Sequence, residues 1–281
     1  MQLTNFSKMH GLGNDFIIFN NLDNNIFFTE TLVRNLSNRN TGIGCDQLII
    51  VEKSVINKVD FFCRIFNSNG SEVFQCINGV RCFGKFINIK KISTKKNLYV
   101  MTKNQKIYLN DIDTDCISVK LSNPIFDPNK IPFLRKYSKY GYYAHIGNIK
   151  IQYFIVSLGN PHCVIFVDRI HYANVKTIGT FFEKNSLFPC GVNVNFVEII
   201  SRNEIYVRTY ERGVGETKAC GSGACASVVI GVKNSILNEN VLVNLLGGKL
   251  NIFCKKNLKR VILSGSAIHV FDGVINLKSF Y

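Results

Sequence analysis

Two cysteines in this chain have matching surroundings, 144 positions apart (220 − 76). Cys76 and Cys220 each follow a glutamate by four residues, and these are Glu72 and Glu216. A small polar residue stands two positions after each cysteine, and a glycine three positions after it. A cysteine thiol ionises at a pKa of about 8.5, so it can take up or release a proton near neutral pH. Two equivalent thiols are therefore candidates for a pair of acid–base groups.

Each cysteine precedes a segment with helical spacing of apolar residues, 80–87 in the first case and 223–230 in the second. A helix N-terminus presents free N–H groups and a partial positive charge. We expect this to lower the pKa of both thiols. We also expect the N–H groups next to them to hold a carboxylate. These groups belong to Ile77, Asn78, Gly221 and Ser222.

The chemistry that suits two such thiols is inversion of a stereocentre. If both reach one carbon atom, a thiolate removes its proton from one face and the opposite thiol delivers a proton to the other. A carboxylate held by the helix ends would stabilise the negative charge that develops. The reaction needs no cofactor, and the sequence carries no fingerprint for a metal or an organic cofactor.

Other uses of two cysteines remain open at this point. A redox pair usually lies close in sequence, and a cysteine hydrolase would leave the second cysteine unexplained. Both could also be core residues, as we expect for Cys63 and Cys163 within apolar strands. The chain lacks a C-x-x-C pair, which argues against a structural zinc site.

The composition is that of a globular protein, and the length suggests two domains. The chain has 281 residues, of which 46% are hydrophobic, and its net charge is +15. The basic residues are scattered in short pairs, so the charge indicates compositional drift rather than a nucleic-acid surface. No apolar stretch is long enough for a membrane span, and no signal peptide is visible at the N-terminus. We therefore expect a cytoplasmic protein that binds neither nucleic acid nor membrane.

The two cysteine segments are part of a longer repeat. Three motifs recur in the same order at nearly one offset: the turn and strand 12–19 at 158–166, the strand 60–67 at 204–211, and the cysteine segment. We infer a duplicated domain. Helices are expected over 28–38 and 175–185, with Thr29 as N-cap. Three of the five prolines fall within 124–132, which predicts the linker there.

Long motifs throughout the chain resemble diaminopimelate epimerase. They are Lys8-Met-His-Gly-Leu-Gly-Asn-Asp-Phe16, Phe66-Asn-Ser-Asn-Gly-Ser-Glu72, Cys76-Ile-Asn-Gly-Val-Arg-Cys82, Gly159-Asn-Pro-His162 and Tyr210-Glu-Arg-Gly-Val-Gly-Glu-Thr-Lys-Ala-Cys-Gly-Ser-Gly223.

The resemblance implies an α+β fold of two pseudo-symmetric lobes, each a mostly antiparallel sheet wrapped around a central helix. The first lobe would comprise residues 1–124, completed by 269–281, and the second 125–268. The family interconverts LL- and meso-2,6-diaminopimelate without pyridoxal phosphate or another cofactor, on the route to lysine and peptidoglycan. Its members are typically homodimers.

The resemblance also assigns roles to individual residues. Cys76 and Cys220 would be the base and acid, and His162 and Glu211 would influence their protonation. The residues implied to hold the substrate are Asn14, Gln47, Asn67, Asn160, Asn193, Glu211 and Arg212. Plainer roles exist for some of them: the asparagines also suit turns, and His162 could be a core histidine whose nitrogens are satisfied.

One position departs from the family pattern. Ile77 stands where the family usually has glycine after the first catalytic cysteine. An isoleucine still offers its N–H group but takes a positive φ angle only with strain. We expect activity if this position needs only a helical backbone.

Three other functions are compatible with parts of the sequence. A proline or hydroxyproline racemase would use the same proton transfer between two thiols, but its substrate lacks a second charged end. A basic nucleic-acid-binding protein would lose binding steeply with salt and would be indifferent to Cys76. A binding module with a decayed site would account for Ile77.

Overall fold

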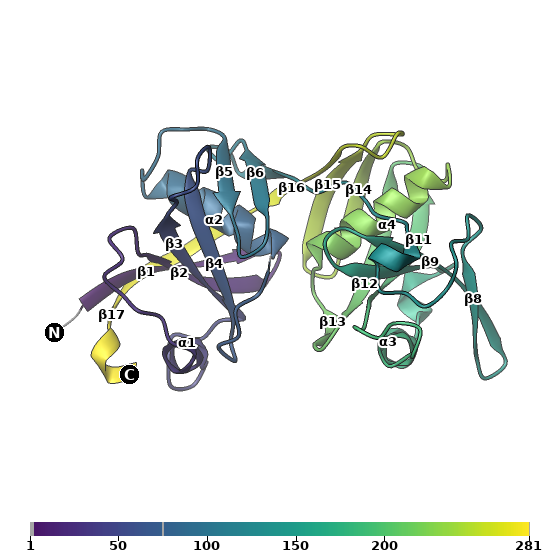
Figure 1. The fold of residues 1–281 in the computed structure, drawn as a ribbon, viewed down its shortest axis with the longest axis horizontal. Helices are drawn as coiled ribbons and strands as arrows, with labels where there is room; N and C mark the ends of the chain where they lie inside the picture. Colours follow the sequence, from purple (N-terminus) through teal and green to yellow (C-terminus); the bar gives the residue numbers. More distant parts are fainter. Residues whose placement is uncertain (1–2, 75, 281) are drawn as a thin grey trace. The chain divides into compact units, whose positions relative to one another are not determined.

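The computed structural model describes residues 3–74 and 76–280, and the fold is shown in Figure 1. The chain divides into two compact units, Met1–Lys120 with Ser264–Tyr281 and Leu121–Leu263. These bounds lie a few residues before the expected ones, 124/125 and 268/269. The predicted linker, 124–132, contains the short 3₁₀ helix η1 (Pro128–Lys130) and belongs to the second unit.

The first unit contains strands from both ends of the chain. Its elements are β1 (Leu3–Gly11), β2 (Asn14–Asn20), α1 (Glu30–Ser37), β3 (Gln47–Lys53), β4 (Phe61–Asn67), α2 (Ile77–Ile89), β5 (Leu98–Met101), β6 (Lys106–Asn110), β7 (Cys116–Lys120), β17 (Ile268–Asn276) and η3 (Leu277–Phe280). β17 pairs antiparallel with β1. The predicted N-cap of α1 is confirmed, since the Thr29 side chain accepts a hydrogen bond from the N–H of Leu32.

The second unit repeats this order of elements. They are β8 (Tyr142–Ile146), β9 (Ile149–Ser157), β10 (Pro161–Phe166), η2 (Ile170–Tyr172), α3 (Val175–Glu183), β11 (Asn193–Ser201), β12 (Glu204–Glu211), β13 (Gly215–Thr217), α4 (Gly221–Lys233), β14 (Asn240–Leu245) and β15 (Gly248–Cys254). β16 (Val261–Ser266) runs across the boundary between the units.

The two units share one pattern of strand pairing. In the first, β2 is parallel to β3, β3 antiparallel to β4, β4 parallel to β5 and β5 antiparallel to β6. In the second, the corresponding pairs are β10 with β11, β11 with β12, β12 with β14 and β14 with β15, in the same orientations. The sequence-based inference of a duplicated domain is therefore confirmed, and so is the α+β fold class.

Each unit encloses one helix almost completely. Nearly every residue of α4 is buried, and α2 is buried along most of its length, including the charged Arg81 at 0% exposure. A helix that is apolar around its whole circumference must be covered on all sides. Figure 1 shows α2 and α4 each surrounded by the strands of its own unit. The burial of this central helix thus fixes the position of its N-terminus within each unit.

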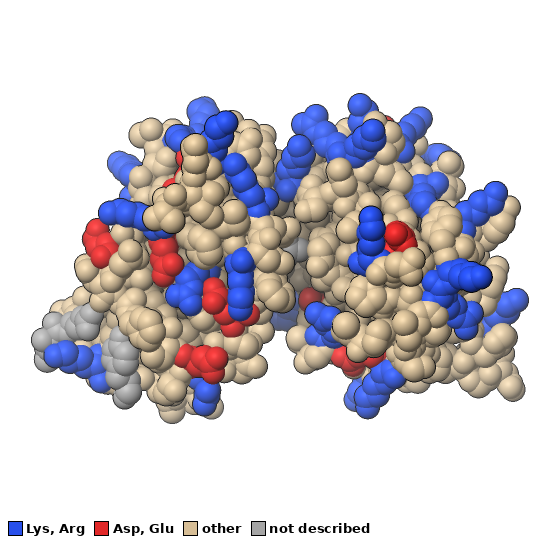
Figure 2. Space-filling model, viewed as in Figure 1, with Lys and Arg blue, Asp and Glu red and all other residues tan. Residues whose placement is uncertain are grey.

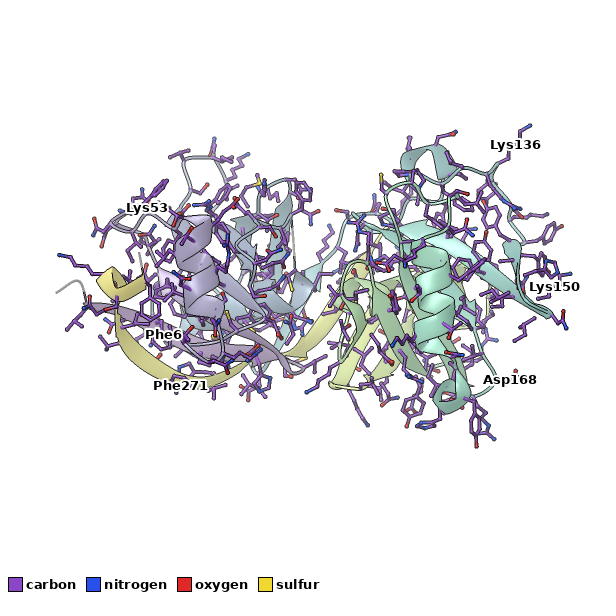
Figure 3. All side chains as sticks on the ribbon, turned by 90° about the horizontal axis from the view of Figure 1, so that it is seen from below. Phe6, Lys53, Lys136, Lys150, Asp168 and Phe271 are labelled. Carbon is purple, nitrogen blue, oxygen red and sulfur yellow. The ribbon has the colours of Figure 1, made fainter. Side chains whose placement is uncertain are left out.

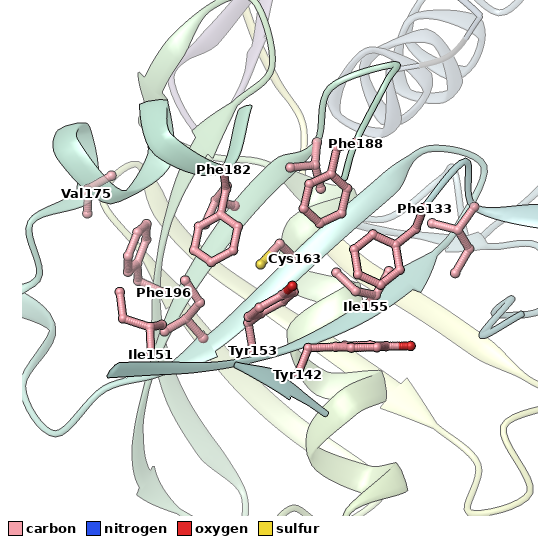
Figure 4. Close-up of a cluster of buried hydrophobic side chains, with 14 of the residues drawn as sticks. Phe133, Tyr142, Ile151, Tyr153, Ile155, Cys163, Val175, Phe182, Phe188 and Phe196 are labelled. Carbon is pink, nitrogen blue, oxygen red and sulfur yellow. The ribbon is translucent and has the colours of Figure 1, made fainter. Parts of the chain in front are cut away.

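Aromatic side chains fill the other face of the second unit's sheet. Phe133 stacks on Phe188 with ring centroids 4.8 Å apart, and Tyr153 meets Phe182 edge-on at 4.8 Å. Cys163 lies within this cluster at 0% exposure (Figure 4). Cys63 in the first unit is equally buried, so both are core residues, as predicted.

Several strands were not predicted from the sequence, among them β1 and the hairpin of β8 and β9. β1 contains few β-branched residues, and its partner β17 lies at the opposite end of the chain. The hairpin of β8 and β9 falls in the stretch just after the expected linker. Pairing with a distant strand leaves little local signal, because strand stability depends on the neighbour.

The surface carries its charge in a scattered way. Figure 2 shows Lys and Arg side chains spread over the visible face of both units, with acidic side chains between them. Within residues 3–74 and 76–280, no helix is long and apolar enough to cross a membrane.

Candidate active site

The repeated cysteines occupy the same structural position in both units. Cys76 is the N-cap residue of α2 and Cys220 the N-cap residue of α4, each with an extended backbone. The carbonyl of each accepts the first hydrogen bond of its helix, from Val80 and Ala224 respectively, at 2.9 Å. The sequence-based placement of Cys76 at a helix N-terminus is confirmed. Ile77 has the helical backbone of a first-turn residue, so no positive φ angle is needed there.

The glutamate four residues before each cysteine has a structural role. Arg64 donates two hydrogen bonds to the carboxylate of Glu72, at 3.0 and 3.3 Å. Arg208 does the same to Glu216, at 2.6 and 3.0 Å. A bidentate pair of this kind fixes the geometry of both partners. In each unit it ties the strand before the cysteine segment to the segment itself.

The first unit holds two groups of hydrogen-bonded candidate residues, and one of them includes Cys76. The thiol of Cys76 donates to Oδ1 of Asn14 at 3.6 Å, and Nδ2 of Asn14 donates to Asp46 at 3.1 Å. Nε2 of Gln47 donates to Oδ1 of Asn67 at 2.9 Å. The other amide atom, Oε1 of Gln47, is buried and has no hydrogen-bond donor among the residues described. A buried acceptor of this kind suits the ammonium group of a ligand.

The turn that carries Asn14 is held by charged side chains. Burial alone would raise the pKa of Asp15, but hydrogen bonds from Arg39 and Lys8 hold it well below its usual range. Arg39 also bonds Asp46, the partner of Asn14. This network therefore keeps Asp15 ionised and fixes the amide of Asn14 through Asp46.

The helix end next to Cys76 is buried. Ile77 and Asn78 are 6% and 3% exposed, and Oδ1 of Asn78 accepts a hydrogen bond from Arg81 at 3.1 Å. Arg81 also donates to the carbonyl of Ser266, at 3.3 Å. The side chain of Asn78 is thus part of the packing.

The second cysteine lies beside an acidic residue. Thr217 donates to Oε1 of Glu211 at 2.5 Å, and the thiol of Cys220 also donates to this carboxylate. Burial raises the pKa of Glu211. Ser222 lies 3.6 Å from the sulfur of Cys220.

The expected lowering of both thiol pKa values is wrong for Cys220. Burial raises its pKa well above the usual value, and the negative charge of Glu211 raises it further. Hydrogen bonds from Ser222 and the N–H of Gly223 act in the expected direction but are outweighed. A desolvated thiolate is costly, because the low-polarity surroundings cannot replace its water. Cys220 is therefore a protonated thiol at neutral pH.

A loop of the second unit presents an arginine. The N–H of Arg212 donates to Oδ1 of Asn193 at 3.0 Å, and Nδ2 of Asn193 donates to the carbonyl of Pro161 at 3.2 Å. The exposed guanidinium donates to the carbonyl of Cys190 at 2.5 Å. Gly191 has a φ of +67°, and a Cβ there would lie 2.7 Å from Cδ of Arg212. Glycine thus lets the arginine lie close to this turn.

His162 is fully buried, and both of its ring nitrogens are in use. Nε2 lies 3.0 Å from Oδ1 of Asn160, and Nδ1 lies 3.2 Å from Nδ2 of Asn195. Burial, with a contribution from the positive charge of Arg212, lowers the pKa of His162 to about 3. His162 is therefore bonded as a core histidine would be, with a hydrogen-bond partner for each ring nitrogen.

Several residues that shape the site were not found from the sequence. Asp46, Thr217, Asn195 and Thr209 each bond a candidate residue or its partner. For Asn195 a signal existed: it stands two residues after Asn193 in an apolar strand, and such residues share a face. Within the described part of the chain, no three acidic, histidine or cysteine side chains are grouped as metal ligands.

Comparisons with known proteins cover nearly the whole chain. The sequence model of the family described as diaminopimelate epimerase matches residues 6–125 and 154–270. A diaminopimelate epimerase of Blochmanniella floridana is 46% identical over 274 residues, which cover 97% of this chain and 99% of that protein.

Solved structures of low sequence identity share the fold. A PhzF-family phenazine biosynthesis protein of Bacillus anthracis has a TM-score of 0.71 at 15% identity, covering 98% of this chain and all of that one. A hydroxyproline epimerase of Agrobacterium vitis, with bound trans-4-hydroxy-L-proline, has a TM-score of 0.71 at 9% identity, covering 98% of this chain and 92% of that one. These likenesses concern the fold alone, whereas the match of sequence and family model is specific: this chain belongs to the diaminopimelate epimerase family.

Proposed function

We propose that this protein interconverts LL- and meso-2,6-diaminopimelate, with Cys76 and Cys220 as the two groups that exchange a proton with the α-carbon. One observation carries the proposal: each of two equivalent units places a cysteine as the N-cap of its buried central helix. Membership of the family supplies the substrate, because the Blochmanniella floridana relative bears the name diaminopimelate epimerase.

The proton transfers balance between the two sulfurs. In one direction the thiolate of Cys76 takes the α-proton, so that a C–H bond breaks and an S–H bond forms. Cys220 gives its proton to the opposite face, and the charge passes to its sulfur. The raised pKa of Cys220 supports its start as the donor, and Glu211 receives the thiol hydrogen bond before the substrate arrives. In the reverse direction the roles exchange.

The substrate's charged groups have candidate partners on the chain. The backbone N–H groups of Ile77, Asn78, Gly221 and Ser222 would hold the carboxylate on the reacting carbon, as helix N-termini hold anions. This would stabilise the carbanion-like charge.

The distal end of the substrate carries an ammonium and a second carboxylate. The exposed guanidinium of Arg212 and the amides of Asn160 and Asn193 would bind the carboxylate. Oε1 of Gln47, which has no donor within residues 3–74 and 76–280, would accept from an ammonium, and Asn14 and Asn67 complete this polar set.

The test follows exchange of the α-hydrogen of meso-diaminopimelate in deuterated water by NMR and mass spectrometry. Wild type is expected to incorporate deuterium and form the LL isomer. Cys76→Ala and Cys220→Ala are each expected to abolish epimerisation, by at least about 10³-fold, because each removes a group that no other replaces. Cys116→Ala, which changes an exposed cysteine, serves as the matched control.

Full exchange in either active-site variant would contradict the two-thiol mechanism. Trans-4-hydroxy-L-proline, the ligand of a structural relative, is the competing substrate. Its turnover in place of diaminopimelate would favour a racemase of the proline type. Chemistry on neither compound would leave a binding module as the conclusion.

We also propose that the protein is a cytoplasmic homodimer that uses the β1–β17 edge as its interface. β17 leaves Val270, Phe271 and Val274 about half exposed, and Leu3 of β1 is 64% exposed. Phe271 meets Phe6 edge-on at 6.0 Å, so part of this surface is already ordered (Figure 3). Exposed apolar patches of this kind mark interaction sites. Val274→Asp is expected to shift the mass in light scattering from dimer to monomer, and an unchanged mass would contradict this interface.

A further inference from the structure

The second unit buries a chain of polar side chains beneath the N-terminus of α4. His162, Asn195 and Thr209 are 0%, 0% and 1% exposed. Oγ1 of Thr209 donates to Oδ1 of Asn195 at 3.1 Å. Nδ2 of Asn195 bonds Nδ1 of His162, and Nε2 of His162 bonds Oδ1 of Asn160, which is half-buried. The chain therefore leads from the interior to a candidate substrate-binding amide.

The hydrogen-bond partners fix the direction of every link. Nδ2 of Asn195 also donates to the carbonyl of Cys163 at 3.1 Å. A carbonyl only accepts, so this atom must be the amide nitrogen. Its second N–H then points to Nδ1 of His162, which must accept. A neutral imidazole carries one proton, so the proton is on Nε2 and is donated to Oδ1 of Asn160.

The fold itself does not require this polar chain, because the first unit builds the same place from apolar residues. Ile49 pairs with Ile65 across β3 and β4 as Asn195 pairs with Thr209 across β11 and β12. Phe16 takes the place of His162, since Phe16 is opposite Gln47 as His162 is opposite Asn193. Phe16, Ile49 and Ile65 are 0%, 0% and 1% exposed.

The packing around the two sets is also equivalent. A Cβ on Gly79 of α2 would lie 3.0 Å from the ring of Phe16 and 3.2 Å from Ile49. A Cβ on Gly223 of α4 would lie only 2.2 Å from Oδ1 of Asn195 and 3.0 Å from Oγ1 of Thr209. The polar set is thus pressed against the first turn of the helix that Cys220 caps.

Polar groups at a buried position usually destabilise a fold relative to well-packed apolar ones. Their presence in one unit only calls for a purpose beyond stability. The end of the chain supplies one. With Oδ1 of Asn160 occupied by the histidine, the amide must turn its two N–H groups the other way. The N–H of Arg212 bonds Asn193, the residue opposite His162, so the arginine belongs to the same part of the second unit as this chain.

We propose that His162, Asn195 and Thr209 are positioning residues that lock the carboxamide of Asn160 with its NH₂ group toward a carboxylate of the substrate. His162 then serves as a neutral donor to the amide of Asn160. This inference rests on the proposed function, because it names a task within the same substrate site. It gives His162 the task of holding the binding amide.

The first test is independent of catalysis and uses the full chain labelled with ¹⁵N-histidine. NMR distinguishes the two tautomers by the chemical shifts of the ring nitrogens. His162 is one of five histidines, and its signal is identified by its loss in His162→Gln. We expect the Nε2–H tautomer, without titration between pH 5 and 8. An Nδ1–H tautomer or a titration in that range would overturn the inference.

The second test separates positioning from mere packing with a matched pair of variants. His162→Phe copies the first unit and removes the donor, whereas His162→Gln keeps an N–H near the place of Nε2. We expect the Phe variant to raise KM for diaminopimelate about 10- to 100-fold with a small change in kcat. The Gln variant is expected to recover most of this loss in KM. A similar fall of kcat in both variants would instead show that His162 moves protons.

Should His162→Phe fail to fold, the third member of the chain provides the same comparison. Thr209→Val removes the hydroxyl at nearly constant volume, and Thr209→Ser retains it. We expect a KM about 3- to 10-fold higher for the Val variant only. Equal KM values for the two variants would overturn the inference. Failure of the proposed function is seen separately, as α-hydrogen exchange that survives in the cysteine variants.

Discussion

Lowering the pH from 7.5 to 5 is expected to destabilise the second unit by about 2 kcal/mol through His162 alone. The pKa of this histidine is lowered to about 3 by burial, with a contribution from Arg212. In the unfolded chain the same side chain has a pKa of about 6.5. Between these values the unfolded state binds a proton that the folded state refuses, so stability is lost as the pH falls.

The magnitude follows from the two pKa values. At pH 7.5 both states hold a neutral imidazole, and the difference is close to zero. At pH 5 the unfolded histidine lies 1.5 units below its pKa of about 6.5, which at 1.36 kcal/mol per unit gives about 2 kcal/mol. The folded histidine is still neutral there. The loss would approach a limit of about 5 kcal/mol only near pH 3.

Other shifted groups act outside this window or cancel in the comparison. The lowered pKa values of Asp15 and Asp272 cost stability only as the pH falls below about 3.8. The raised pKa of Glu211 has the opposite sign, because the folded state then binds its proton more readily. The contribution of Glu211 to stability is the same in wild type and in a variant at His162, so it cancels when the two are compared.

The assay is urea unfolding at both pH values, followed by circular dichroism, for wild type and His162→Phe. We expect wild type to lose about 2 kcal/mol more than the variant between pH 7.5 and pH 5. The variant should keep the fold, because Phe16 fills the equivalent place in the first unit. An equal loss in both proteins would refute a neutral, desolvated His162.

Four further substitutions have expected outcomes. Gly223→Ala brings a methyl group to 2.2 Å from a buried amide oxygen and should cost about 2 kcal/mol in urea unfolding. Gly79→Ala, with its nearest contact at 3.0 Å, should cost less, and equal costs would count against the close approach. Glu211→Gln should lower the pKa of the Cys220 thiol, so that iodoacetamide labels this peptide at lower pH; an unchanged labelling profile would contradict the pair. Ile77→Gly empties a nearly buried site and loses helix propensity, so the free energy of unfolding should fall by about 3 kcal/mol, and a fall below about 1 kcal/mol would show that the side chain packs loosely.

Much of the fold was accessible from the sequence because its signals are local. Three kinds of feature depend on neighbouring residues: the N-cap at Thr29, the helices that follow the cysteines, and the strands within 60–67 and 204–211. The internal repeat added the relation between the units. β1 was missed because its stability comes from β17, and no local pattern announces such a partner.

For the candidate site, residue types were easier to predict than their electrostatics. The position of Cys220 at a helix start was foreseen, but its raised pKa was not, because burial cannot be summed from a short segment. Likewise, the sequence pointed to His162 and Asn160 but not to Asn195, which lies behind them. The role of such a residue depends on what its side chain touches, and that is decided by strand pairing.

The duplication allows structural and functional residues to be told apart within one chain. Features present in both units, such as the pairs Arg64–Glu72 and Arg208–Glu216, serve the shared scaffold. Features found in one unit only are not required for the shared fold, because the other unit forms it without them. The polar set that ends at Asn160 belongs to this second kind, because apolar side chains fill the same place in the first unit without loss of the fold. The two ends of diaminopimelate differ in what they must do during the reaction, since only one carbon is inverted. Under the proposed two-thiol mechanism, a site for it needs two equivalent thiols but two different sets of binding groups, and the modified interior of one unit supplies such a difference.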